Sequence, residues 1–143
     1  MLLQIMAARL MPHQEQLIQS LELASEQAGD ITSLVYECYF KKCPESRELM
    51  WHLDDLVKGK MLAEVFRLLM DTDLSKEGGY LDFEVRTHQQ SYGVLGHMYH
   101  NLMDALIETL EAVLGSHWSE SYALAWKVRT NELLDAISGH LKK

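Results

Sequence analysis

The stretch Val85-Arg86-Thr87-His88-Gln89-Gln90-Ser91-Tyr92-Gly93-Val94 is the segment from which we predict the fold. It places His88 near the end of a short helical segment, and Gly93 to Gly96 is expected to bend the chain. A long helix follows, whose apolar residues recur every three or four positions: Met98, Tyr99, Leu102, Met103, Leu106, Leu110, Val113 and Leu114. The stretch therefore predicts a histidine at a helix end that faces an apolar surface.

The composition predicts one globular domain over residues 1–143. Hydrophobic residues make up 48% of the chain and charged residues 24%, an ordinary balance for a soluble protein. The net charge of −8 repels phosphate groups, so we expect neither nucleic acid nor an anionic membrane surface as a partner. No run of about 18 apolar residues occurs, so no segment is expected to span a bilayer.

The two cysteines, Cys38 and Cys43, lie close together on one predicted helix. At a separation of five positions their side chains point in different directions, so we expect no disulfide between them. Reduced thiols are typical of a cytoplasmic protein. Residues 1–11 are interpreted as an N-terminal extension, because no positive charge precedes their apolar run as it would in a signal peptide. We therefore expect a cytoplasmic location.

Helical spacing of apolar residues occurs along the whole chain, and no segment shows the alternation of a strand. Asp30 and Ser116 are predicted N-caps, Gly115 a C-terminal cap, and Gly78-Gly79 the end of a polar connection. We predict an all-α chain with helices over about 12–27, 31–42 and 53–70, a short turn begun by Pro44, a short helix with His88, a long helix to Leu114, and a last helix to about 141.

This order of helices resembles the globin family, from Leu17 onward. Four groups of residues carry the resemblance: Tyr36 and Phe40 with Pro44, the segment VKGKML at 57–62, His88 with Val94 and Tyr99, and Leu114-Gly115 with Trp118 and Ala125-Trp126. The resemblance implies a globin fold of about seven helices around a pocket for haem b (iron protoporphyrin IX), with His88 as the proximal iron ligand. The residues expected around the haem are Leu34, Tyr36, Met50, Lys58, Leu62, Phe66, His88, Val94, Tyr99 and Leu102.

Several of these residues have a plainer interpretation. His88 could be a solvated histidine in a helix corner, although a neutral imidazole is a common haem ligand. Tyr36 is expected to donate a hydrogen bond to bound oxygen, and otherwise to be an ordinary buried tyrosine. Lys58, at the distal position, could extend to solvent, reach inward as a cation, or bind iron as the free amine; we favour the first.

Three further histidines, at two places in the sequence, could bind a metal. His52 lies near the expected pocket rim and is the second choice for a sixth iron ligand. His97 and His100, with Asp104 one turn further on, have a spacing that could bind a metal ion. No fourth group is evident, so we expect these three side chains to face solvent.

The resemblance implies a protein that reversibly binds a diatomic gas: oxygen, nitric oxide or carbon monoxide. Storage, nitric oxide dioxygenation, electron transfer and sensing all remain open, and redox turnover would need an external electron donor. A homodimer is compatible with the sequence. The alternative is a globin-fold sensor or interaction domain that has lost haem. Met50 replaces the family's phenylalanine beside the haem, and Gln89 occupies a slot that often holds histidine in bacterial globins, which favours this alternative.

Overall fold

The computed structural model describes residues 13–71 and 73–141, which form seven α-helices and two short 3-10 helices. No strand occurs in these residues, so the predicted all-α class is confirmed for them. None of their helices is long and apolar enough to cross a membrane. The elements are α2 (Gln14–Ala28), α3 (Thr32–Lys42), α4 (Pro44–Met50), α5 (Asp55–Met70), η1 (Leu74–Glu77), α6 (Gly78–Tyr92), α7 (Gly96–Leu114), η2 (Gly115–His117) and α8 (Glu120–Ser138).

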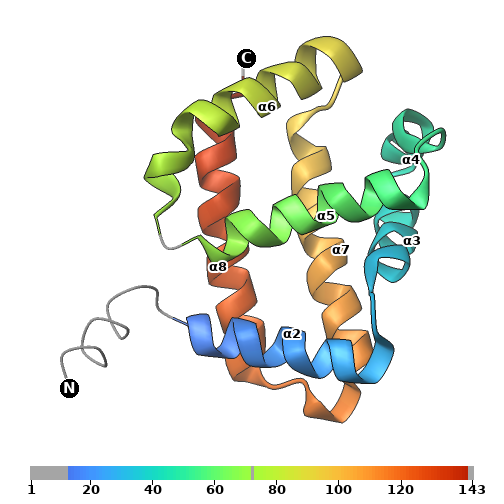
Figure 1. The fold of residues 1–143 in the computed structure, drawn as a ribbon, viewed down its shortest axis with the longest axis vertical. Helices are drawn as coiled ribbons and strands as arrows, with labels where there is room; N and C mark the ends of the chain where they lie inside the picture. The colour runs from blue at the N-terminus through green and yellow to red at the C-terminus, as the bar shows by residue number, and fades with distance from the viewer. Residues whose placement is uncertain (1–12, 72, 142–143) are drawn as a thin grey trace.

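The two long helices α7 and α8 run beside each other, and shorter helices cover their ends and sides (Figure 1). α2 crosses one end of the pair and α6 lies across the other end. α3 packs along α7, followed by α4, and α5 crosses the molecule from α3 to α8. The space enclosed by α3, α4, α5, α6 and α7 holds the cavity described below.

The core is built around α7, as the spacing of its apolar residues predicts. Leu106 and Leu110 are fully buried and Met103 nearly so. On the α8 side, Trp126 is fully buried, and its indole N–H donates to the hydroxyl of Ser20 in α2 over 2.8 Å. This bond satisfies the only polar atom of a side chain that is otherwise ideal for an apolar core.

The helix that carries His88 is longer than predicted. Gly78 and Gly79 were expected to end a polar connection, but they form the first turn of α6. The reason lies just before them: Asp73 accepts a hydrogen bond from the backbone of Ser75 and starts the 3-10 helix η1, which leads directly into α6. A preformed turn lowers the cost of starting a helix at glycine.

The other end of α6 is as predicted. Gly93 has φ 68° and ψ 27°, a left-handed conformation that suits glycine, and it ends the helix. The backbone carbonyl of His88 accepts a hydrogen bond from the Val94 N–H over 3.0 Å. The position of His88 in the last turn is therefore fixed by the helix end itself.

Two predicted N-caps are wrong. Ser116 lies within the 3-10 helix η2, and Ser119 caps α8 by accepting a bond from the Tyr122 backbone N–H over 3.2 Å. Asp30 lies one residue before the cap position, which Ile31 occupies, and it accepts bonds from Thr32 instead. In both cases the predicted capping residue lies too far before the first residue of the helix, which is Thr32 in α3 and Glu120 in α8.

The remaining helix ends differ by a few residues. The turn predicted at Pro44 is the complete helix α4, α5 begins after its N-cap Asp54, and α8 ends three residues before the predicted end at 141. Gly115 is the C-terminal cap of α7, as predicted. The predicted start of the first helix at Pro12 and the predicted N-terminal extension, residues 1–11, lie outside the described residues.

Candidate functional site

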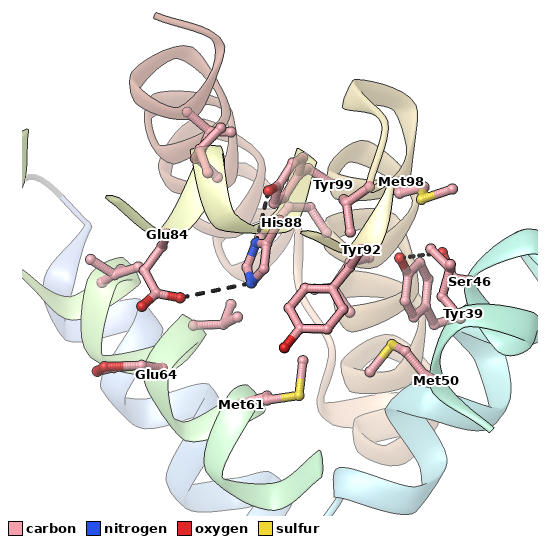
Figure 2. A pocket seen from close by; sticks show the side chains of 18 of the residues that line it. Tyr39, Ser46, Met50, Met61, Glu64, Glu84, His88, Tyr92, Met98 and Tyr99 are labelled. Atoms are coloured by element: carbon pink, nitrogen blue, oxygen red, sulfur yellow. Dashed lines mark hydrogen bonds and ion pairs between the residues drawn. The ribbon is translucent and has the colours of Figure 1, made fainter. Parts of the chain in front are cut away.

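A cavity of about 440 Å³ lies beneath α6, between α5 on one side and α3, α4 and α7 on the other (Figure 2). Sites for cofactors and small ligands commonly measure about 300–1,000 Å³. Most of its surface is apolar. The apolar residues of its wall include Leu49, Met50, Met61, Val65, Leu68, Val85, Val94, Met98, Leu102 and Met103.

His88 projects from the last turn of α6 into this cavity, with each ring nitrogen near a different partner (Figure 2). Its Nδ1 lies 2.9 Å from the hydroxyl of Tyr99, on α7, and its Nε2 lies 3.7 Å from a carboxylate oxygen of Glu84. Burial lowers the pKa of His88 below its usual value, although Glu84 opposes this effect. At neutral pH the ring is therefore a neutral imidazole, the form that binds metals.

Tyr99 and Tyr36 are two of the cavity's hydroxyl groups. Burial raises the pKa of each to about 12, so both remain protonated at physiological pH. Tyr99 is bonded to His88, whereas the described residues offer the Tyr36 hydroxyl no hydrogen-bond partner. Tyr36 therefore retains a donor for a ligand inside the cavity.

Four other polar side chains in the wall have hydrogen-bond partners. The Tyr39 hydroxyl lies 2.6 Å from the hydroxyl of Ser46. Glu64 accepts a bond from the Tyr80 hydroxyl over 3.1 Å and also contacts the guanidinium of Arg67. The imidazole of His88, with Glu84 beside it, and the hydroxyl of Tyr36 are then the most buried polar groups that can meet a ligand, and His52 and Tyr92 lie in the exposed part of the wall.

The structure places six of the ten residues expected around the haem in the cavity wall: Tyr36, Met50, His88, Val94, Tyr99 and Leu102. Lys58, Leu62 and Phe66 lie on a neighbouring stripe of α5. Leu62 is buried in the core, and Phe66 packs edge-on against Trp126 with ring centres 6.4 Å apart. The wall is formed instead by Val57, Met61, Glu64, Val65 and Leu68.

Lys58 lies beside Tyr36, outside the cavity wall. Its Nζ is 5.9 Å from the centre of the Tyr36 ring and 3.5 Å from the exposed carboxylate of Asp55. The side chain is 21% exposed and points neither into the cavity nor fully into solvent. The ammonium group lies over the face of the Tyr36 ring, in a cation–π arrangement.

Other expected positions fall outside the cavity. Leu34, expected as an apolar wall, is 42% exposed on the outside of α3, because the inward face of that helix is formed by Val35, Tyr36 and Tyr39. His52 does line the cavity, at an exposed position. The trio of His97, His100 and Asp104 is not a cluster: His97 is bonded to Glu45 over 2.8 Å.

Glu84 is the residue that the sequence interpretation missed. It precedes His88 by four positions, a separation that puts two side chains on one face of a helix. This spacing was the available signal for a carboxylate beside the imidazole. Tyr92, four residues after His88, lines the cavity by the same rule, and 59% of its surface is exposed.

The donor set suits a large, mostly apolar ligand that is held by one imidazole and one hydroxyl. A histidine that binds a metal usually makes a hydrogen bond through its other ring nitrogen, as Nδ1 of His88 does with Tyr99, while Nε2 has the Glu84 carboxylate beside it. No protein-family model matches the chain, and the search of curated proteins finds no match to it.

Proposed function

We propose that this chain is a globin-type haem protein that binds a diatomic gas, with His88 as the protein's ligand to the iron. The observation that carries the proposal is the environment of His88: Nδ1 is 2.9 Å from Tyr99 and Nε2 faces an apolar cavity of about 440 Å³. Haem, when bound, would supply the iron that takes up the gas, and His88 would hold that iron. The cavity beneath α6 is where the haem would bind.

The groups around the imidazole fit this role. With Nε2 facing the iron, Nδ1 carries the proton and donates it to the Tyr99 oxygen, which fixes the tautomer and the plane of the ring. Glu84 has to turn away from Nε2. Its side chain is 36% exposed, so the carboxylate can move into water at little cost. The His88 imidazole is then a neutral iron ligand that already points into the cavity.

Haem titration tests the proposal. Full-length protein, purified without a histidine tag, is titrated with haem and its visible spectrum is recorded before and after addition of carbon monoxide to the reduced form. We expect saturation at one haem per chain and a sharp Soret band that shifts with carbon monoxide. A spectrum that stays that of free haem would contradict the proposal.

A second candidate function is a haem-free sensor or interaction domain. The contact between His88 and Glu84, 3.7 Å, favours it, because an imidazole with a carboxylate neighbour needs no metal to satisfy its second nitrogen. In that case the cavity would take an apolar small molecule. Failure of the haem titration together with saturable binding of a fluorescent apolar probe would support this alternative.

We expect Tyr36→Phe to speed oxygen release by roughly tenfold. The hydroxyl would donate a hydrogen bond worth about 1–2 kcal/mol in a dry cavity, and about 1.4 kcal/mol corresponds to a factor of ten. Stopped-flow measurement of the oxygen off-rate checks this. Tyr39→Phe is the matched control, because that hydroxyl is already bonded to Ser46. Equal off-rates in both variants would remove Tyr36 from the gas site.

We expect Tyr99→Phe to weaken haem binding by about tenfold or more, because loss of a partner that orients a metal ligand typically has that effect. The ring and its packing remain, so the fold should be unchanged. Haem transfer to apomyoglobin measures the loss rate. Tyr122→Phe, which removes an exposed hydroxyl bond to Gln19 outside the cavity, is the control. The same loss rate in wild type and Tyr99→Phe would show that the bond does not position His88.

A further inference from the structure

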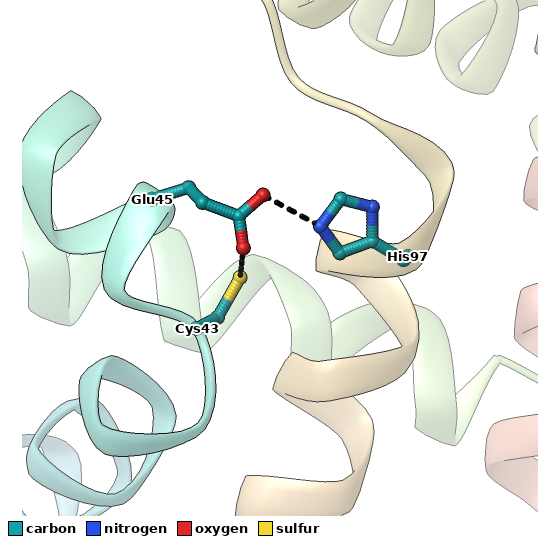
Figure 3. A group of neighbouring side chains, drawn as sticks. All are labelled: Cys43, Glu45 and His97. Carbon is teal, nitrogen blue, oxygen red and sulfur yellow. Dashed lines mark hydrogen bonds and ion pairs between the residues drawn. The ribbon is translucent and has the colours of Figure 1, made fainter.

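Three side chains of types that can bind metals, two from the start of α4 and one from α7, meet outside the cavity (Figure 3). Cys43 lies at the junction of α3 and α4, Glu45 in the first turn of α4, and His97 in the first turn of α7. The Cys43 Sγ is 3.6 Å from one carboxylate oxygen of Glu45, and the His97 Nε2 is 2.8 Å from the other. One ligand atom from each residue lies within 4.8 Å of the other two.

We propose that Cys43, Glu45 and His97 bind one Zn²⁺ ion, with water in the fourth position. Zinc takes tetrahedral sets of thiolate, imidazole and carboxylate, and its bond lengths of about 2.0–2.3 Å place neighbouring ligand atoms about 3.3–3.6 Å apart. The two observed separations, 2.8 and 3.6 Å, lie on either side of this range. Small rotations of the Glu45 and His97 side chains would therefore bring the three ligand atoms to the distances that zinc requires. Both side chains are about half exposed and free to make that adjustment.

The choice of zinc follows from the donor types. A thiolate with an imidazole excludes calcium and magnesium, which prefer oxygen ligands. The thiol is also held in place: Cys43 is fully buried and its Sγ accepts a hydrogen bond from the Ser46 hydroxyl over 3.2 Å. This bond would orient the sulfur once it is a thiolate, as outer groups do in known metal sites.

Metal at this site would act on the cavity through two routes. Ser46 is also bonded to Tyr39, which lines the cavity, so a chain of hydrogen bonds runs from the thiol to the cavity wall. The ion would also join the start of α4 to the start of α7. These segments precede Met50 and Tyr99, both of which line the cavity, so zinc would hold the two walls together.

The test is a zinc titration of reduced, tag-free, full-length protein by calorimetry. We expect one Zn²⁺ per chain, and an affinity that falls by about tenfold or more in Cys43→Ser and in His97→Gln. Cys38→Ser and His100→Gln are the matched controls, since they remove the same donor types from the same regions without touching the site. Both controls should bind zinc like the wild type.

Cobalt gives an independent readout. Co²⁺ added to the same protein should produce a thiolate-to-cobalt charge-transfer band that persists in Cys38→Ser and is lost in Cys43→Ser. Because the His97 side chain is about half exposed, His97→Gln should keep the fold. Its zinc affinity therefore tests the site even if the variant at the buried Cys43 is unstable. Absence of saturable zinc binding, or equal affinity in wild type and His97→Gln, would overturn the proposal.

Discussion

Replacement of His88 by glycine is expected to abolish specific haem binding, with a fall in affinity of more than about 100-fold. Removal of a partner that merely orients a metal ligand costs about 10–100-fold, and loss of the ligand itself should cost more. The cavity keeps its apolar walls, so weak, heterogeneous haem uptake with a broadened Soret band should remain. The measurement is the haem titration described above, repeated on the variant.

Imidazole in solution should rescue the His88→Gly variant. A glycine leaves space for a free imidazole next to Tyr99, and the rescued complex should recover the sharp spectrum. His52→Gly is the matched control, because His52 lines the same cavity from its exposed side. If His52→Gly loses haem and His88→Gly keeps it, the ligand comes from the opposite wall.

The second large effect concerns stability. Arg129 is only 4% exposed, and its guanidinium donates to the backbone carbonyls of Leu68, Leu69 and Asp71 at the end of α5. The last carbonyls of a helix have few partners within it, although the Leu68 carbonyl also accepts the Asp71 backbone N–H over 3.2 Å. A cation at this end also complements the helix dipole. Arg129→Met keeps the length of the side chain but removes the guanidinium as hydrogen-bond donor to all three carbonyls. We expect a loss of about 3–5 kcal/mol in the free energy of unfolding.

Urea denaturation of the wild type and of Arg129→Met measures this loss of stability. Arg86→Met is the matched control: Arg86 pairs with Asp82 over 3.2 Å, its side chain is 52% exposed, and such surface pairs contribute less than about 1 kcal/mol. Similar free energies of unfolding for Arg129→Met and Arg86→Met would show that the buried guanidinium does not stabilise the end of α5.

The segment around His88 could be predicted because its signals are local. Gly93 ends α6 in a left-handed conformation, and the regular apolar spacing of α7 fixes which of its residues face inward. Together these features bring Tyr99 to His88, and the two side chains lie 2.9 Å apart. Short-range sequence patterns decide each of these features, so no knowledge of the distant helices was needed.

The orientation of α5 could not be predicted in the same way. This helix has two neighbouring apolar stripes: one contains Leu62 and Phe66, the other Met61 and Val65. Either stripe could face a cavity. In the structure Phe66 packs against Trp126 of α8, so the stripe with Met61 and Val65 faces the cavity. Such a contact between distant segments leaves no periodic signal in the sequence. The cluster of Cys43, Glu45 and His97 was missed for the same reason, since α4 and α7 lie far apart along the chain.

The resonance Raman spectrum of the ferrous, gas-free haem complex is the most direct measurement of whether His88 holds the iron. We expect an iron–imidazole stretching band in the wild type that disappears in His88→Gly and returns when imidazole is added. The band should shift in Tyr99→Phe, because the bond to Nδ1 strengthens the imidazole as a ligand. A band that persists in His88→Gly without imidazole, or a wild-type haem complex with no such band, would contradict His88 as the iron ligand.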